Sequence, residues 1–419
     1  MTPYFKSRHA RDWLEELLAH ADIRLDGSRP FDIRVHDERL FERVAGAGTL
    51  GAGEAYMEGW WDCESLDRLF TRAISAGLEN RLRLNLYTLA LAVRHTLFNM
   101  QSSRRAPMVA RRHYDFGNEL FEAMLGPNMN YSCAWWSGLK EVKNGKGGRA
   151  PAKPGSAAAP EGAPDALPAC YPQNPGTRLD EAQNAKMELI CQKLHLEPGM
   201  EVLDIGCGWG ALARYMARHY DCHVTGISVS RNQIDWARQT EGRAPAGPGR
   251  INWILGDYRD LRGEFDRIVS VGMFEHVGAK NYRRYFRTAR ELLRPNGLFL
   301  LHTIGTLSLR AGCDPWISRY IFPNGQLPTL DAIARACRGL FVLEDCHNMG
   351  ADYDPTLMAW HERFGQGLRS GAFDLTDTEA RMFRYYLLTC AAAFRCRDLE
   401  LWQIVLSPTG VAGGYEAVR

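Results

Sequence analysis

The stretch Val202-Leu-Asp-Ile-Gly-Cys-Gly-Trp-Gly210 decides the fold of this chain of 419 residues. A short apolar run ends in Asp204, three glycines follow at alternate positions, and residues 211–220 carry apolar side chains at helical spacing. A strand that passes through a glycine-rich turn into a helix is typical of a nucleotide-cofactor site in an α/β sheet. Glycine lets the backbone approach a ligand, and the start of the helix offers free N–H groups. A tight structural turn is the alternative interpretation of this run on its own.

The spacing of the glycines indicates the kind of cofactor. A dinucleotide fingerprint would read G-x-G-x-x-G with an acidic residue about 20 residues further on. Here Gly206, Gly208 and Gly210 read G-x-G-x-G with Asp204 just before them, which suits a ligand that lacks a pyrophosphate. The pattern resembles the first motif of class I S-adenosylmethionine (SAM) methyltransferases.

The bulk composition is that of an ordinary globular protein. Hydrophobic residues make up 45% and charged residues 24% of the chain, and the net charge of +2 gives no overall field that would favour nucleic acid. The 11 cysteines form no CxxC pair and no zinc-like spacing, and no export signal precedes them, so we expect a cytoplasmic protein without a metal site. No run of about 18 apolar residues is present, so we expect no membrane span.

Composition and periodicity predict four segments. Residues 1–105 mix helical periodicity with a short strand-like piece at 31–35, which predicts a smaller, mainly helical domain. Residues 106–137 are interpreted as a linker helix and the start of the catalytic domain, which continues over 178–419. Between them, residues 138–177 are rich in Ala, Pro and Gly and cannot bury enough apolar surface to order themselves, which predicts a flexible insertion.

The segment 82–98 has apolar residues at helical spacing, and seven arginines lie around it. Such a basic helix can lie on an anionic membrane surface, or it can be the solvated face of an ordinary core helix. The residues alone leave both interpretations open.

Regular alternation from residue 179 onward predicts a mainly parallel, doubly wound sheet of seven strands. The expected strands cover 200–204, 224–228, 251–255, 265–271, 298–303, 341–345 and 401–406. Helices are expected over 181–194 and 281–293. A further helix is expected to begin after Ser230, which suits an N-cap, and residues 355–394 are expected to form a helical insertion. Ligands bind beyond the carboxyl ends of such strands. Five polar residues at or just past those ends are expected to converge: Asp204, Ser228, Asp257, Glu275 and His302.

Eight segments together point to one family. They are 113–118 (HYDFGN), 130–134 (NYSCA), 203–210 (LDIGCGWG), 271–278 (VGMFEHVG), 301–305 (LHTIG), 316–328 (WISRYIFPNGQLP), 350–354 (GADYD) and 394–398 (FRCRD). The chain resembles the cyclopropane-fatty-acyl-phospholipid synthases, which are related to the mycolic acid cyclopropane synthases, over nearly its whole length outside 138–177. The glycine motif alone has little specificity. Glu275, His302 and the run Tyr131-Ser132-Cys133 are together highly specific.

The resemblance implies an activity and a set of site residues. A methyl group from SAM is added to a cis double bond of a phospholipid acyl chain, and a bound bicarbonate ion removes a proton from the resulting cation so that the ring closes. The resemblance assigns the bicarbonate site to Cys133, Glu275, His302, the backbone of Ile304, and Tyr353. It also implies a homodimer at the inner membrane surface, in which residues 1–105 contact lipid and mediate dimerisation.

The cofactor residues follow from the motif and the resemblance together. Asp204, Gly206 and Gly208 are expected at the methionine end of SAM, and Tyr131 and Ser132 over the sulfonium. The second strand ends without the usual acidic residue for the ribose, so Ser228 and Gln233 are the candidates there. Asp257 and Tyr258 are expected beside the adenine.

Plainer interpretations exist for several of these residues. Cys133 could be a buried core thiol, Glu275 a helix cap and His302 a structural histidine. At the level of function, the alternatives are a SAM-dependent lipid methyltransferase that forms no ring, and a SAM-binding scaffold without activity. The complete set of Cys133, Glu275, His302 and Tyr353 favours deprotonation and ring closure.

Overall fold

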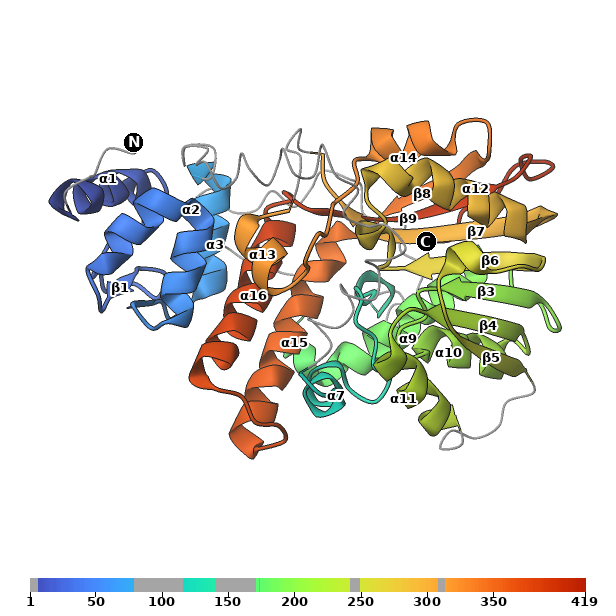
Figure 1. The fold of residues 1–419 in the computed structure, drawn as a ribbon, viewed down its shortest axis with the longest axis horizontal. Coiled ribbons are helices and arrows are strands. Elements are labelled where there is room, and N and C mark those ends of the chain that lie inside the picture. Colours follow the sequence, from blue (N-terminus) through green and yellow to red (C-terminus); the bar gives the residue numbers. More distant parts are fainter. Residues whose placement is uncertain (1–6, 79–115, 140–170, 173, 242–248, 308–312) are drawn as a thin grey trace, which may run out of the picture.

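The computed structural model describes residues 7–78, 116–139, 171–172, 174–241, 249–307 and 313–419. They form a small helical domain at the N-terminus and a larger α/β domain (Figure 1). Among these residues, no helix has the length and apolar character needed to cross a bilayer. The predicted helix over 82–98 and the arginines around it lie outside the described residues.

The α/β domain is built on one seven-stranded sheet. Its strands are β3 (Glu201–Ile205), β4 (His223–Ser228), β5 (Arg250–Leu255), β6 (Phe265–Val271), β7 (Leu293–Gly305), β8 (Val342–Asn348) and β9 (Glu400–Ser407). The spatial order is β5-β4-β3-β6-β7-β9-β8. The first five strands run parallel, and β9 pairs antiparallel with β7 and β8. The predicted seven-stranded, mainly parallel, doubly wound sheet is therefore confirmed.

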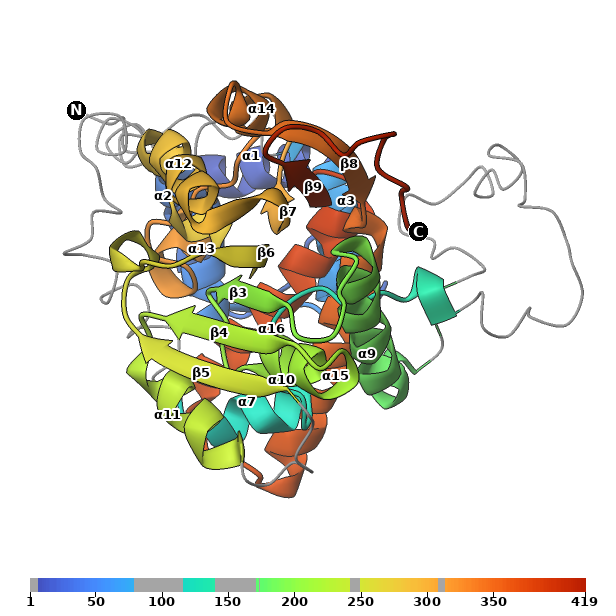
Figure 2. The same ribbon diagram turned by 90° about the vertical axis from the view of Figure 1, so that its right-hand side faces the viewer.

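Alternate strand residues build two apolar layers, because successive side chains of a strand point to opposite faces. On one face, Val202 and Leu300 pack with α9 (Pro175–Lys193), α10 (Ala211–His219) and α11 (Arg231–Glu241). On the other face, Leu203 and Phe299 pack with α12 (Tyr282–Leu292) and α14 (Leu330–Cys337). Figure 2 shows α9 and α12 on the two sides of the sheet. This arrangement brings the carboxyl ends of β3 to β7 to one edge.

A helical hairpin between β8 and β9 joins the two domains. It consists of α15 (Gly350–Ser370) and α16 (Asp377–Arg395), so the helical insertion predicted over 355–394 is confirmed and begins a few residues earlier. A capping box, in which Thr376 and Glu379 each bond the other's backbone, starts α16. The hairpin shares one core with α2 (Arg39–Met57), α3 (Leu66–Ser75), α7 (Asn118–Leu125) and α13 (Pro315–Tyr320). Figure 1 shows α16 between the small domain and the sheet domain.

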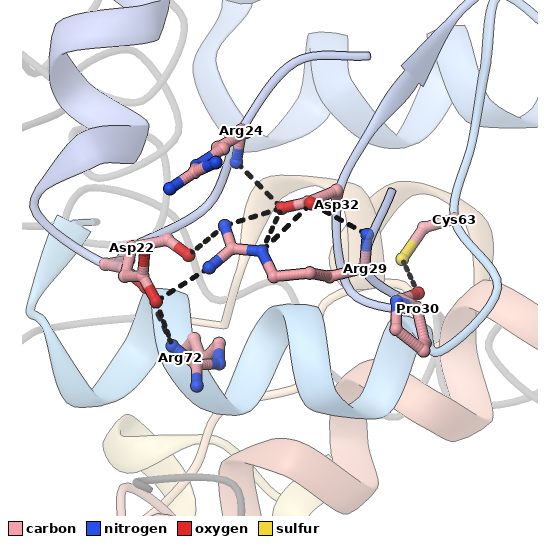
Figure 3. Close-up of polar contacts among 8 residues, drawn as sticks. Asp22, Arg24, Arg29, Pro30, Asp32, Cys63 and Arg72 are labelled. Atoms are coloured by element: carbon pink, nitrogen blue, oxygen red, sulfur yellow. Dashed lines mark hydrogen bonds and ion pairs between the residues drawn. The ribbon is translucent and has the colours of Figure 1, made fainter. Parts of the chain in front are cut away.

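The small domain contains α1 (Ser7–Ala19), α2, α3 and a two-stranded ribbon of β1 (Arg34–Val35) and β2 (Trp61–Asp62). The strand predicted over 31–35 is thus reduced to two residues. The buried Asp32 lies in a turn instead of a strand. Its carboxylate accepts hydrogen bonds from the backbone N–H groups of Arg24 and Arg29 and from the Arg29 guanidinium (Figure 3). A buried carboxylate needs such partners to offset its lost hydration.

Two more elements begin earlier than predicted, and β8 ends three residues later than the strand predicted over 341–345. Helix α9 begins at Pro175, inside the segment that was predicted as insertion, because proline is well suited to the first position of a helix. The predicted strand over 298–303 begins earlier, since Leu293 already has extended backbone and pairs with Phe265. The chain therefore passes from α12 directly into β7.

Candidate active site

A cavity of about 220 Å³ opens at the carboxyl ends of the parallel strands. Its wall combines the glycine turn after β3, the ends of β4 and β5, and the loop that follows α7. All nine residues predicted to bind the cofactor line it: Tyr131, Ser132, Asp204, Gly206, Gly208, Ser228, Gln233, Asp257 and Tyr258. The structure thus brings these residues together, while their roles in binding stay a prediction.

The glycine turn needs its glycines for two reasons. Gly206 has a positive φ of 83°, and a Cβ there would lie 2.8 Å from the Cβ of Met273. Gly210 has a φ of 84°, and a Cβ there would lie 2.2 Å from the Trp253 ring. Residues with side chains rarely adopt such a backbone and have no room for it here. The turn therefore keeps its backbone at the cavity wall.

Two buried ionisable side chains line the cavity: Asp204 and Lys186, which was not predicted from the sequence. Burial raises the pKa of the Asp204 carboxyl to about 7, and the charge of Lys186 opposes this rise. Lys186 is almost fully buried on α9, and burial lowers its pKa to about 8. Its Nζ donates to Ser132 Oγ at 2.9 Å and to Asn130 Oδ1 at 3.3 Å. Lys186 thereby fixes the loop that carries Tyr131 and Ser132.

A signal for Lys186 was present in the sequence. Gln183, Lys186 and Lys193 recur at helical spacing on the face of α9 that also carries Leu179 and Ile190, and all five side chains are buried. A polar residue on an apolar helix face indicates that a buried polar partner lies opposite it. For Gln183 the partner is the backbone carbonyl of Ser132, 2.8 Å away.

The predicted ribose and adenine residues lie at the ends of β4 and β5. Ser228 Oγ donates to Gln233 Oε1 at 3.1 Å, so these two buried groups form a pair on the cavity wall. Asp257 is engaged by Arg259, whose Nε donates to Oδ1 at 2.7 Å. Arg259 was not anticipated from the sequence, although it is only two residues from the predicted aspartate. The ring of Tyr258 packs edge-on against Tyr285.

A second group of predicted residues meets at the ends of β6 and β7. Glu275 lies in a 3-10 turn, Phe274–His276, directly after β6, and its Oε1 accepts from the backbone N–H of Ile304 at 2.7 Å. The turn therefore does not use Glu275 as a helix cap. Burial raises the pKa of Glu275 to about 7. Its other oxygen, Oε2, is buried and has no hydrogen-bond partner within the described part of the chain.

His302 belongs to this group through the pairing of β7 with β6. It pairs with Val271, and its carbonyl accepts from the N–H of Gly272 at 2.9 Å. Burial holds the pKa of His302 well below its ordinary value, and nearby positive charges on Lys186 and Lys193 act in the same direction. The imidazole is therefore neutral. Its Nδ1 contacts Gln403 Nε2 at 3.2 Å, and its Nε2 is buried without a partner among the described residues.

Cys133 and Tyr353 complete the second group. Cys133 is fully buried, and burial raises its pKa well above the usual range, so it is a thiol; its Sγ lies 3.2 Å from the carbonyl of Ala134. Tyr353, in the first turn of α15, stacks on Phe394 with ring centres 4.4 Å apart. Burial raises the pKa of Tyr353, and the charged forms of Cys133 and Glu275 raise it further, so both lie within electrostatic range.

Two side chains that sequence analysis missed attach the loop of Cys133 to α15. Thr356 accepts from the N–H of Ala134 at 3.1 Å and from Trp136 Nε1 at 2.9 Å. Asp352 accepts from the N–H of Trp136 at 3.0 Å. Both are buried polar groups with their partners satisfied, which fixes the geometry of a loop that would otherwise be free to move.

The two groups of residues adjoin but do not share one cavity wall. Glu275, His302, Cys133 and Tyr353 are not among the residues that line the cofactor cavity. However, Met273 and His276 flank Glu275 in the chain, Ser132 precedes Cys133, and all three line the cavity. Glu275 and Cys133 are therefore connected through the backbone to residues of the cavity wall.

Comparisons with known proteins agree with this arrangement. The sequence profile of the family described as mycolic acid cyclopropane synthetase matches residues 101–149 and 164–404, and so skips the middle of the predicted insertion. The cyclopropane-fatty-acyl-phospholipid synthase of Escherichia coli (strain K12) is 46% identical over 405 residues, which cover 96% of this chain and 94% of that protein. The tuberculostearic acid methyltransferase UfaA1 of Mycobacterium tuberculosis is 31% identical over 388 residues, covering 89% of this chain and 82% of that protein.

A solved structure extends the similarity to the fold. The mycolic acid cyclopropane synthase CmaA1, complexed with SAH and CTAB, superimposes with a TM-score of 0.57 and 26% identity over 72% of this chain and 97% of that chain. The class I methyltransferase fold and the resemblance stated from the sequence are thus confirmed. The chain belongs to the mycolic acid cyclopropane synthetase family of S-adenosylmethionine-dependent methyltransferases.

Proposed function

We propose that the protein transfers a methylene group from SAM to the cis double bond of acyl chains in unsaturated phospholipids, giving cyclopropane fatty acids. The name of the Escherichia coli relative, which aligns with nearly the whole chain, supports this substrate. The observation that carries the proposal is that Glu275, His302, Cys133 and Tyr353 are all buried, and that neighbours of Glu275 and Cys133 in the chain line the cofactor cavity.

The chemistry sets two demands on the chain. An unactivated alkene is a poor nucleophile, so the protein must align it with the methyl group that SAM supplies; such positioning can contribute about 7–11 kcal/mol. The carbocation formed next must be kept from water, which would trap it as an alcohol. Apolar and aromatic residues that line the cavity, Ile321 and Phe322 from the segment 316–328, help to exclude water there.

The buried group fits a small anion that serves as base. Two polar atoms there, Oε2 of Glu275 and Nε2 of His302, are buried without partners among the described residues. We propose that they hold a bicarbonate ion, with Tyr353 and Cys133 beside it. When bound, this ion supplies a base that is not covalently attached to the protein and that takes the proton from the new methyl group. The contribution of the Ile304 backbone stays a prediction; in this structure its N–H donates to Glu275.

Glu275 is suited to share a proton with such an anion. A carboxylate beside an anion is repulsive unless a proton lies between them. Burial raises the pKa of Glu275 to about 7, so near neutral pH the side chain can hold a proton or accept one. The neutral His302 ring offers an N–H or a lone pair and adds no charge.

We further propose that the protein is cytoplasmic and acts as a homodimer. The dimer associates peripherally with the inner membrane surface, where its substrate lies. In this proposal, residues 1–105 contact lipid and the second copy, and residues 178–419 carry the reaction. The tight attachment of the small domain supports a joint role: Arg395 of α16 binds Asp67 of α3 at 2.8 Å and Asp354 of α15 at 2.9 Å.

A second candidate function is methylation without ring closure. The name of the relative UfaA1, a methyltransferase, favours it. Both functions use the same cofactor cavity, and in both the methylated cation must lose a proton. Only ring closure joins the methyl carbon to the second carbon of the former double bond, whereas the alternative leaves a branched alkene.

The experiment that separates them is product analysis after incubating purified protein with SAM and vesicles of cis-unsaturated phospholipid. A gain of one methylene in mass, loss of the olefinic proton signals and new ring-proton signals support cyclopropanation. The same gain with a branched or shifted alkene supports the second candidate. No gain, despite saturable SAM binding, contradicts both for this lipid.

A further inference from the structure

A glutamine stands in the middle of the most deeply buried strand of the sheet. Every residue of β9 is buried, and Gln403 has no exposed surface. An amide in such a place destabilises the fold unless it is hydrogen-bonded. The Nε2 of Gln403 lies 3.2 Å from Nδ1 of His302, while its Oε1 is buried and unpartnered among the described residues. The contact with His302 is therefore what offsets the cost of burying this amide.

The pairing of the strands makes this contact part of a row across the sheet. Gln403 is directly opposite His302 of β7 on one side and His347 of β8 on the other. Directly opposed residues of antiparallel strands point to the same face. His347 Nδ1 in turn contacts Nζ of the buried Lys193, 2.9 Å away. His302 is thus contacted from one side by Gln403, whose place opposite it is fixed by the strand register.

Which group donates in the contact between Gln403 and His302 decides the tautomer of the His302 ring. The groups that act electrostatically on His302 are Lys186, Lys193 and His347, all of which disfavour a positive charge on its ring, as does burial. A neutral imidazole carries one proton, and its position follows from the partner of the other nitrogen. An amide nitrogen can only donate, so Nδ1 accepts and the proton resides on Nε2.

We propose that Gln403 is a positioning residue for the reaction: its amide donates to Nδ1 of His302 and keeps the ring proton on Nε2, so that His302 presents a hydrogen-bond donor to the anion in the active site. This inference rests on the proposed function, because only a bound anion gives Nε2–H a partner. Without Gln403, the proton distributes between the two nitrogens and the ring is free to turn.

The tautomer is directly measurable. Protein labelled with ¹⁵N in the histidine rings is examined by NMR, and the His302 signals are assigned by their loss in His302→Gln. We expect the proton on Nε2 in the parent protein. A proton on Nδ1 overturns the proposal before any variant is made, and this measurement does not depend on whether the protein forms cyclopropanes.

Two variants then test the consequence. In Gln403→Glu the carboxylate accepts from Nδ1–H and moves the proton to Nδ1; in Gln403→Met no polar partner remains. We expect the NMR signature to change in both, kcat to fall on the order of 10- to 100-fold, as for other residues that orient a site histidine, and the Kd for SAM to stay unchanged, since Gln403 does not line the cavity.

A matched control lies on the same strand. Ser407→Ala removes the hydroxyl that bonds Glu344 and the N–H of Gly410, far along β9 from His302. It should keep the parent tautomer and kcat. Equal loss of kcat in Ser407→Ala, or parent tautomer and kcat in both Gln403 variants, overturns the role of Gln403. If the parent forms no cyclopropane, the proposed function fails, while the NMR result still decides the tautomer.

Discussion

Replacing Glu275 by glutamine should slow ring formation by several orders of magnitude and at the same time stabilise the protein at alkaline pH. The amide of the variant keeps an oxygen that can accept from the N–H of Ile304, as Oε1 of Glu275 does at 2.7 Å. Unlike the carboxylate of Glu275, the glutamine amide cannot accept a proton. Loss of a general acid or base typically costs about 10²–10⁴ in rate. SAM binding should be unchanged, because Glu275 does not line the cofactor cavity.

The effect on stability follows from the pKa of Glu275, which burial raises from 4.5 to about 7. Below pH 4.5 both the folded and the unfolded chain hold the proton, so the ionisation has no effect. Between pH 4.5 and 7 only the unfolded chain is ionised, and stability falls as pH rises. Above pH 7 the penalty is constant. At about 1.4 kcal/mol for each pKa unit, it amounts to about 3 kcal/mol.

Glutamine removes this penalty at every pH. The free energy of unfolding of Glu275→Gln, measured by urea denaturation, should exceed that of the parent by about 3 kcal/mol at pH 8 and by roughly nothing at pH 4.5. Glu181→Gln, an exposed change on α9, should show no such pH-dependent gain. A Glu275→Gln variant that is less stable than the parent at pH 8, or that forms cyclopropanes at the parent rate, would refute the reasoning.

Three further changes have clear expected outcomes. Lys186→Met removes the hydrogen-bond donor to Ser132 and raises the pKa of Asp204 further. The Kd for SAM, measured by calorimetry, should therefore rise at least about tenfold, which corresponds to one charged hydrogen bond. An unchanged Kd would show that Lys186 does not contribute to cofactor binding. Deleting residues 150–163, which the family profile skips, should leave the rate of ring formation within about twofold, and aggregation of the shortened protein would contradict this. Asp354→Asn breaks the buried pair with Arg395 and should lower the unfolding free energy by about 3–5 kcal/mol; a drop below about 1 kcal/mol would show that this pair does not stabilise the hairpin of α15 and α16.

The fold could be predicted from the sequence because its signals are local. Each strand of the sheet is a short apolar run, and Ser230 and Gly210 mark helix starts next to them. The boundaries that failed depend on longer-range contacts. The extension of β7 to Leu293 requires its pairing with Phe265, and the shortening of the ribbon at 31–35 requires the turn closed by Asp32. Neither partner is visible in local periodicity.

Residue patterns alone predicted the candidate site only at the carboxyl ends of strands, whereas Tyr131, Ser132, Cys133 and Tyr353 were predicted from the family resemblance. Asp204, Ser228, Asp257, Glu275 and His302 were found because parallel strands end at one edge. Lys186, Thr356 and Gln403 were missed, because each lies inside a helix or strand and acts through a partner distant in the chain. Such residues are recognisable only as polar groups at positions where periodicity demands apolar ones.

The buried ionisable groups of the site share one tendency, which connects the fold to the chemistry. Burial raises the pKa of Asp204 and Glu275 to about 7, lowers that of Lys186 to about 8, and lowers that of His302 well below its usual value. All four are thereby shifted toward their neutral forms. Groups that change charge near pH 7 can both give and accept protons there. Neutral side chains cost less free energy to bury than charged ones before the substrate arrives. In the same low-dielectric surroundings, their protonation still responds strongly to a cationic cofactor and to a cation that forms on an apolar chain. Burial, which the proposed reaction needs to exclude water, therefore also supplies the proton affinities that the proposed deprotonation requires.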